Sequence, residues 1–475
     1  MIPFNQTKIV CTIGPATETK AMMRKLIMAG MDTMRLNFSH SYYEEHKKRL
    51  DTLNELNEEL GTNVAALLDT KGPEIRTHNF KDGKATIEVG STVEIHMEEI
   101  LGDSTRFSVN YPILYKDVKV GVMIVVDDGY LSLKITDIDE DRKVITTESF
   151  NTHTIKDKRG INVPGMRLSL DFISDKDRAD IKWGCDNGID FIAASFVRRK
   201  EDVLALREIV KENCPEREVQ IIAKIENQEG VNNIDEIIEV SDGIMIARGD
   251  LGVEVPPEEV PVIQKDIIER CHVAGKISIT ATQMLESMQE NPKPTRAEVS
   301  DVANAILDGA DATMLSGESA IGKYPVESVE VMRNIAKRME KEIKRLEWTN
   351  RANRSMRRDI PSNIALSATH AVLQGNADIV IAPSVSGTTA RLLSKNRPDT
   401  MVLALVPTAA KARSLALNHG IKAVVFHLGT DTEDLIKRAI EFVKKQKLAS
   451  SGSRVIITGG FPLGTSTNSL RIMDI

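Results

Sequence analysis

The sequence has few cysteines and few aromatic residues for its length. Four cysteines in 475 residues form no Cys-x-x-Cys pair, and aromatic residues make up 4% of the chain. Cysteines scattered in this way argue against a disulfide framework or a cysteine zinc site and favour reduced thiols. We therefore expect a cytoplasmic protein.

Two further absences exclude classes of partner. No apolar run approaches the ~18 residues of a membrane span, and residues 1–8 lack the basic start and apolar core of a signal peptide. Lys and Arg number 62 and Asp and Glu number 69, which gives a net charge of −7 and no global field for nucleic acid or anionic lipid. We expect no nucleic acid and no membrane as partners.

Short apolar segments alternate with amphipathic helical patterns over most of the chain. Several of the helical patterns end at glycine, a common helix stop. Eight such segments with helices between them predict an α/β fold, either a closed (β/α)8 TIM barrel or a large open sheet. The predicted strands are 8–14, 32–38, 64–69, 190–196, 219–226, 243–248, 276–282 and 312–316.

The gap between the third and fourth strands has a different pattern. Residues 72–166 contain alternating apolar and polar runs split by Asp-Gly turns, which is typical of hairpins. We predict that 72–166 is an inserted small antiparallel β-barrel lid domain. Without it, residues 1–71 and 167–345 supply about 250 residues, the size of one catalytic barrel, and this favours closure over an open sheet.

The last part of the chain again alternates strands with helices. Its predicted strands are 379–382, 402–406, 423–427 and 455–458. We predict that residues 346–475 form a C-terminal open α/β domain with a doubly wound sheet.

Polar residues gather at the predicted carboxyl ends of the barrel strands, where catalytic groups lie in this architecture. Lys224 and Glu226 are two residues apart and so share a face, and Asp250 ends the next strand unit. A structural salt bridge explains Lys224 and Glu226 equally well. Polar residues at six of eight strand ends nevertheless favour a catalytic site. The others are Arg35, Asn37, Ser39, Asp69, Thr70, Thr280, Thr282 and Ser316.

These residue types indicate phosphoryl transfer. Two carboxylates with neutral oxygens suit Mg²⁺ or Mn²⁺, and two cations, Arg35 and Lys224, can balance a phosphate in transfer. A set of oxygens carrying one charge would fit a monovalent cation. That set is Asn37, Ser39, Asp69 and Thr70. The sequence offers no serine or cysteine nucleophile paired with a base, and positioning with electrostatics dominates phosphoryl transfer.

Long strings in this chain resemble the pyruvate kinase family from end to end. The strings are MRLNFSH, LDTKGPEIR, AKIENQEG, ARGDLGVE, ITATQM and PTRAEVSDVANAILDGADATMLSGE. The resemblance implies transfer of a phosphoryl group from phosphoenolpyruvate to ADP, giving pyruvate and ATP in glycolysis. It also implies an allosteric homotetramer that uses Mg²⁺ (or Mn²⁺) and K⁺, with the lid closing over the barrel mouth.

The resemblance also implies roles for individual residues. The catalytic residues would be Lys224, Arg35 and Thr282. The substrate would contact Arg35, Lys224, Gly249, Asp250 and Thr282, and the nucleotide would contact Asn37, His40, Arg76 and Arg159. The divalent ion would be held by Glu226 and Asp250. Potassium would be held by Asn37, Ser39, Asp69 and Thr70.

Two residues and one loop lie at places where members of the family differ from one another. Glu74 resembles the potassium-dependent version, because potassium-independent relatives carry lysine there. Arg159 stands where lysine is common and keeps the charge. A C-terminal loop resembles the effector phosphate loop and implies a sugar-phosphate effector, although a plain helix-capping turn also explains it. Its residues are Ser384, Ser386, Gly387, Thr388 and Thr389, and several relatives carry a basic residue at Thr388.

Two alternatives to the kinase remain at the sequence level. A metal-dependent barrel lyase or aldolase acting on pyruvate enolate would use the same carboxylates without a lid or nucleotide contacts. A non-catalytic effector-binding protein would show damage at Lys224, Glu226 or Asp250, and all three are intact. The proton donor to enolpyruvate stays open, with Ser316 as a candidate.

Overall fold

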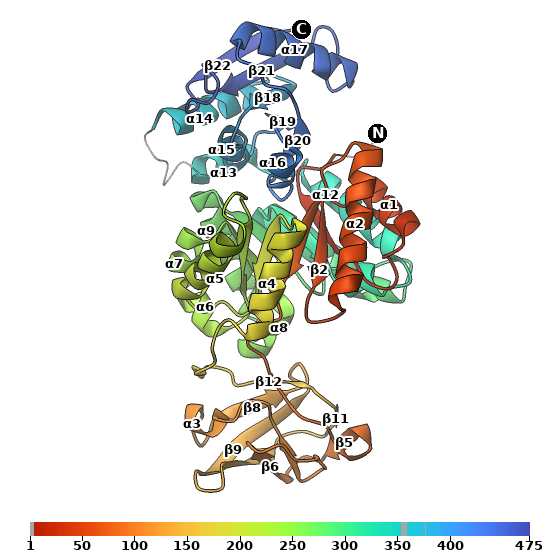
Figure 1. Cartoon of the computed structure of the whole chain (residues 1–475), viewed down its shortest axis with the longest axis vertical. Helices are drawn as coiled ribbons and strands as arrows, with labels where there is room; N and C mark the ends of the chain where they lie inside the picture. Colours follow the sequence, from red (N-terminus) through yellow and green to blue (C-terminus); the bar gives the residue numbers. More distant parts are fainter. Residues whose placement is uncertain (1–3, 353–358, 376) are drawn as a thin grey trace.

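The chain folds into three parts that follow one another along its longest axis. The computed structural model describes residues 4–352, 359–375 and 377–475. Figure 1 shows a group of short strands at one end, a barrel in the middle and a C-terminal sheet at the other end. Every helix in these described ranges is too short or too polar to cross a lipid bilayer. The four cysteines are buried thiols.

Eight parallel strands close into the predicted barrel, in the order β1-β17-β16-β15-β14-β13-β3-β2. The strands are β1 (Lys8–Thr12), β2 (Thr33–Asn37), β3 (Ala65–Asp69), β13 (Phe191–Ala194), β14 (Gln220–Ile225), β15 (Gly243–Ala247), β16 (Ile277–Ala281) and β17 (Ala312–Leu315). Their side chains alternate between the barrel interior and the surrounding helices, and most of both sets are apolar and buried. The closed order confirms the barrel and excludes the open sheet.

Helices surround the barrel, and local sequence signals set their ends. Ser174 and Thr295 each form a capping box at a helix start, and Gly188 and Gly309 end the same helices with φ of 87° and 112°. The main helices are α1 (Lys20–Ala29), α2 (Tyr43–Leu60), α4 (Asp175–Asn187), α5 (Lys200–Asn213), α7 (Ile234–Val240), α9 (Val260–Ala274), α10 (Arg296–Asp308) and α12 (Pro325–Met339). Two shorter helices at strand ends are α8 (Arg248–Glu254) and α11 (Gly317–Ala320).

The segment between β3 and α4 forms a β unit of its own, as the hairpin pattern predicts. Its strands make a seven-stranded sheet, β4-β12-β8-β9-β10-β6-β7, and a two-stranded sheet, β11-β5, around one apolar core. Pairing is antiparallel except between β6 and β7. The strands are β4 (Ile75–Arg76), β5 (Lys84–Ile87), β6 (Thr92–His96), β7 (Arg106–Ser108), β8 (Met123–Val126), β9 (Leu131–Asp139), β10 (Val144–Ser149), β11 (His153–Lys156) and β12 (Gly160–Asn162).

The C-terminal sheet has the order β20-β19-β18-β21-β22, with β22 antiparallel at one edge. Its elements are β18 (Ile379–Pro383), β19 (Val402–Val406), β20 (Ile421–Val425), β21 (Arg454–Gly459), β22 (Ser469–Asp474), α14 (Ile360–Leu373), α15 (Thr388–Asn396), α16 (Ala409–Arg413) and α17 (Thr432–Lys445). Val380 of β18 packs in the core under α14 and α15, whereas Ile381 packs in the core under α17. The sheet is therefore covered on both faces, as a doubly wound sheet requires.

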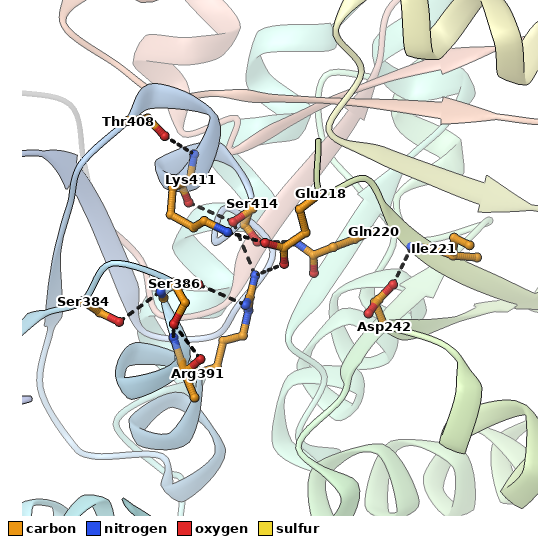
Figure 2. A network of polar contacts seen from close by, with 12 residues as sticks. Glu218, Gln220, Ile221, Asp242, Ser384, Ser386, Arg391, Thr408, Lys411 and Ser414 are labelled. Atoms are coloured by element: carbon orange, nitrogen blue, oxygen red, sulfur yellow. Dashed lines mark hydrogen bonds and ion pairs between the residues drawn. The ribbon is translucent and has the colours of Figure 1, made fainter. Parts of the chain in front are cut away.

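Ion pairs join this C-terminal part to the amino-terminal end of the barrel. Arg413 Nε lies 2.9 Å from Oδ1 of the buried Asp190. Glu218, just before β14, accepts hydrogen bonds from Arg391, at 3.0 Å, and from Lys411. Figure 2 shows both basic side chains converging on Glu218, with Gln220 beside Ser414. These contacts hold the C-terminal part at the end of the barrel opposite the catalytic ends of the strands.

The ion pairs that Arg413 and Lys411 make at this junction should differ in strength. We expect Arg413→Ala to lower the free energy of unfolding by about 3 kcal/mol, because it leaves the Asp190 carboxylate buried without its cation. The matched control Lys411→Ala should lower it by less than about 1 kcal/mol, because the side chain of its partner Glu218 is 45% exposed. Urea unfolding followed by tryptophan fluorescence measures both, and equal losses would contradict the account.

Candidate active site

A buried cluster of opposite charges lies at the carboxyl ends of the barrel strands. Lys224 on β14 has its Nζ 3.0 Å from Oδ1 of Asp69 and 3.0 Å from Oε1 of Glu226. The same Nζ donates a 2.7 Å hydrogen bond to Ser195 Oγ. Asp69 ends β3, and Glu226 and Ser195 follow β14 and β13. Parallel strands thus bring together residues that are 155 positions apart in the chain.

Arg35 joins this cluster from β2. Its Nε donates to Asp69 Oδ2 at 2.6 Å, and its Nη1 donates to Thr12 Oγ1 at 2.9 Å. Asp69 therefore holds Arg35 with one oxygen and Lys224 with the other. The two cations are fixed on either side of one carboxylate. Arg35 keeps the hydrogens of Nη2 for an anion, whereas Lys224 would have to exchange one of its three present partners for it.

Burial and pairing act in opposite directions on these groups. Burial alone would raise the pKa of Asp69, but Arg35 and Lys224 outweigh it and hold that pKa below its usual value. Burial alone would lower the pKa of Lys224, but Asp69 and Glu226 raise it above its usual value. Lys224 is therefore a fixed positive charge and not a proton donor or base at neutral pH.

Glu226 stands out from its neighbours because it is not fully compensated. Burial raises its pKa, Lys224 opposes this, and Asp250 raises it further. Its side chain is 1% exposed, and its Oε2 accepts a 2.6 Å hydrogen bond from the Phe196 amide. Three carboxylates, Asp69, Glu226 and Asp250, accompany two cations here, so a further positive charge would stabilise the ionised form of Glu226. Carboxylate oxygens beside a buried surplus negative charge fit a hard divalent cation.

A second group of predicted residues lies where α8 begins. The Gly249 amide donates to Thr282 Oγ1 at 2.8 Å, and Asp250 follows in the first turn of α8. Thr282 has φ of 68°, an uncommon backbone conformation for a β-branched residue. Such strain is often found at functional sites, and here it turns the Thr282 hydroxyl toward the helix start.

The residues predicted to hold a monovalent cation lie on adjacent strands. Asn37 of β2 is directly opposite Asp69 of β3 in the strand register, and the Phe38 amide between Asn37 and Ser39 donates to the Asp69 carbonyl. Thr70 follows Asp69, and its hydroxyl accepts a 3.1 Å hydrogen bond from the Ser195 amide. The structure therefore brings this set together. Its one charged member, Asp69, already pairs with two cations.

A cavity lies between the barrel mouth and the β unit. None of the four predicted nucleotide residues is among its described lining residues, although Arg76 and Arg159 directly adjoin the lining residues Ile75 and Gly160. The cavity has a volume of ≈ 360 Å³ and is lined by Glu74, Asn162, Asp250 and Glu254, among others. Arg76 Nη2 pairs with Glu74 at 2.6 Å, and Arg159 Nη1 lies 3.5 Å from Asp127. His40 is exposed on the loop after β2, on the barrel side of the mouth.

The predicted effector loop is far from this cluster. It lies at the start of α15, in the part of the chain that Figure 1 shows at the other end of the barrel. Ser384 Oγ accepts from the Gly387 amide at 3.0 Å, Ser386 and Thr388 share a 2.8 Å hydrogen bond, and Thr389 contacts Thr467. The adjoining cavity of ≈ 290 Å³ has no lysine or arginine among its described lining residues.

Sequence reasoning missed two hydroxyl residues of the site. Ser195 contacts both Lys224 and Asp69, and Thr12 anchors Arg35. Both lie near the carboxyl ends of predicted barrel strands. A polar residue at such a strand end was the signal that identified the other residues, and it could have identified these two as well. The candidate proton donor Ser316 lies between β17 and α11, and its amide donates to Glu318.

Comparisons with known proteins match pyruvate kinases over nearly the whole chain. A family model described as "Pyruvate kinase, barrel domain" matches residues 4–329, and one described as "Pyruvate kinase, alpha/beta domain" matches residues 362–473. A pyruvate kinase of Staphylococcus saprophyticus is 48% identical over 99% of this chain and 80% of the relative. One from Staphylococcus aureus is 47% identical over the same shares. A crystal structure of a Cryptosporidium parvum pyruvate kinase superposes with a TM-score of 0.94 at 38% identity, covering 99% of this chain and 96% of that one.

The loop that carries His40 should be sensitive to acid. Beneath it, His46 stacks on Phe38, and one of its ring nitrogens lies 3.1 Å from the His40 carbonyl. Burial lowers the pKa of His46 to about 4, below the value near 6.5 of an unfolded histidine. The stability that it contributes is complete above pH 6.5 and is lost as pH falls toward 4.

We therefore expect His46→Gln to flatten the pH dependence of stability between about pH 6.5 and pH 4. Urea midpoints of the parent and the variant across this range test the expectation. Parallel curves for the two proteins would contradict it.

Proposed function

This chain belongs to the pyruvate kinase family, and from that premise we propose how the mouth of its barrel transfers a phosphoryl group from phosphoenolpyruvate to ADP. The protein is a phosphotransferase that forms pyruvate and ATP. One observation carries the proposed site: Lys224 and Arg35 are held as permanent cations on either side of Asp69, at the catalytic end of the barrel.

We propose that these two cations bind the migrating phosphoryl group. Arg35 has a planar guanidinium that can hold two phosphate oxygens, and Lys224 offers a point charge beside it. Because Asp69 fixes both side chains before the substrate arrives, little reorganisation is needed when charge moves from the enol oxygen to ADP. Lys224 would also neutralise the enolate that forms as the phosphoryl group leaves.

We propose Glu226 and Asp250 as ligands of a divalent cation, Mg²⁺ or Mn²⁺. Their donor atoms are carboxylate oxygens, and the buried surplus negative charge described above supports a cation there. When bound, such an ion supplies Lewis-acid polarisation of the substrate's enol oxygen and carboxylate. The Gly249 amide and the Thr282 hydroxyl would hold the carboxylate end of the substrate, together with Asp250.

The monovalent-ion and nucleotide sites are proposed from the family pattern and the local geometry. K⁺ would lie among the oxygens of Asn37, Ser39, Asp69 and Thr70. ADP would bind beside the ≈ 360 Å³ cavity, whose lining residues Ile75 and Gly160 adjoin Arg76 and Arg159 of the lid. Asn37 and His40 would contact the nucleotide from the barrel. The lid, residues 72–166 as predicted, would exclude water when it closes. Exclusion of water prevents transfer of the phosphoryl group to water in place of ADP.

Three broader proposals rest mainly on the family resemblance. We infer a cytoplasmic location, which the buried free thiols support, and a homotetramer. We infer a sugar-phosphate effector at the Ser384–Thr389 loop, where hydroxyls and the start of α15 can receive a phosphate. The described lining of the adjoining cavity has no lysine or arginine and so offers no cation for a second phosphate.

The direct test of the function is pyruvate formation from phosphoenolpyruvate, Mg²⁺ and K⁺. We expect pyruvate to form only when ADP is present. Pyruvate release from phosphoenolpyruvate without ADP, or cleavage of a larger 2-oxo acid, would favour the lyase or aldolase alternative. Binding of phosphoenolpyruvate without formation of any product would favour the alternative of a non-catalytic effector-binding protein.

We expect Lys224→Met to lower phosphoryl transfer by at least 10³-fold, because it removes the point charge that meets the migrating group. Binding of Mn²⁺, measured by electron paramagnetic resonance, should persist. Lys265→Met is the matched control, because its side chain is 56% exposed and it should leave activity unchanged. Loss of Mn²⁺ binding in Lys224→Met would contradict the assigned role.

We expect Glu74→Lys to weaken the requirement for K⁺, because a fixed cation near the nucleotide cavity replaces a carboxylate that now pairs with Arg76. The ratio of kcat with K⁺ to kcat without it should fall several-fold. Glu74→Gln removes the negative charge without adding a cation and serves as the control. An unchanged ratio in Glu74→Lys would refute the assignment.

A further inference from the structure

The lid touches the barrel through the helix that carries a proposed metal ligand. Asn162, the last residue of the lid strand β12, donates a 3.0 Å hydrogen bond from Nδ2 to Glu254 Oε1. Glu254 is the last residue of α8, four positions after Asp250. Residues four apart share a helix face, so Glu254 and Asp250 point to the same side of α8.

A second lid segment approaches the same helix. Gly129, at the turn between β8 and β9, has φ of 87°, and a side-chain carbon added there would lie 3.8 Å from Val253. Asp128 beside it has a raised pKa, caused by burial, by Asp127 and by Asp250. Two separate lid segments, strand β12 and the turn between β8 and β9, thus meet one short helix that carries Asp250.

The hydrogen bond from Asn162 stabilises the Glu254 carboxylate. Burial raises the pKa of Glu254, the hydrogen bond from Asn162 lowers it, and Asp250 raises it. A carboxylate that is partly buried beside another carboxylate is costly without a donor. Asn162 supplies that donor from the lid, so the bond joins the lid to the barrel.

The position of β12 also sets the position of the lid residues assigned to the nucleotide. Gly160 of β12 pairs with Arg76 of β4, and the Thr77 amide donates to the Arg159 carbonyl. Arg159 directly precedes β12. A contact that fixes Asn162 on α8 therefore fixes both arginines relative to Asp250.

We propose that Glu254 and Asn162 are positioning residues, whose hydrogen bond sets the lid on α8 so that Arg76 and Arg159 meet the nucleotide. The inference rests on the proposed function, since it assigns the two arginines to ADP. All the groups proposed for phosphoenolpyruvate belong to the barrel. Loss of the bond should therefore raise KM for ADP much more than KM for phosphoenolpyruvate.

An exchange of donor and acceptor tests the pair. Asn162→Asp places a second carboxylate against Glu254 and should raise KM for ADP about tenfold or more, with KM for phosphoenolpyruvate changed less than threefold. Glu254→Gln keeps an acceptor for Asn162 and should fall between this variant and the parent. The double variant N162D/E254Q restores one donor and one acceptor with their order reversed, and its KM for ADP should return to within about threefold of the parent.

Lid position is measured separately from turnover. Spin labels at Glu140→Cys in the lid and Glu258→Cys in the barrel report the distance between the two parts, and both positions are exposed. We expect one narrow distance in the parent and in N162D/E254Q, and a longer, broader distribution in Asn162→Asp. Failure of the double variant to restore the distance or KM would overturn the proposal, as would an Asn162→Asp variant with unchanged KM for ADP.

The two readouts also separate this inference from the proposed function. If the parent forms no pyruvate, the proposed function fails, and the spin-label distances still decide whether the pair fixes the lid. If the parent is active and the distances do not respond to Asn162→Asp, the positioning role fails and the kinase assignment stands.

Discussion

The account depends on one constraint: Asp69 must hold Arg35 and Lys224 at once, in a site that is largely buried. The Asp69 side chain is 1% exposed, and each cation side chain is 11% exposed. Unpaired charges at such depth would be strongly destabilising, so the cluster can persist only as a set. The set gives two fixed cations for a phosphate and leaves Glu226 with a negative charge that a divalent ion can balance.

Contacts at both ends of the barrel fix the elements that carry this cluster. At the carboxyl end of the strands, β12 meets α8 through Asn162 and Glu254, four positions after Asp250. At the opposite end, Arg413 and Asp190 attach the C-terminal part, and Gln220, the first residue of the strand that carries Lys224, donates to the Ser414 carbonyl. Strand β14 is therefore held at its amino-terminal end by Gln220, and the lysine near its other end is held by Asp69 and Glu226.

The sequence was sufficient for the barrel and for most of the site. Strand ends with polar residues identified Lys224, Glu226, Asp69 and Arg35, because parallel strands must bring such ends together. The sequence did not predict which charged residues form ion pairs with one another. Lys224 contacts Asp69 as well as its neighbour Glu226, and the contact with Asp69 depends on the register of the barrel strands. Contacts such as Asn162 with Glu254 join residues 92 positions apart that share no periodic pattern, and they emerge only from tertiary packing.

A crystal structure with Mn²⁺ and oxalate, an analogue of the enolpyruvate oxygens, tests the central claim most directly. Anomalous scattering would locate the ion. The account predicts one strong peak coordinated by Glu226 and Asp250, with oxalate oxygens completing the shell and Lys224 Nζ and Arg35 facing the analogue. An ion bound away from these two carboxylates, with Lys224 still confined to Asp69 and Glu226, would contradict it.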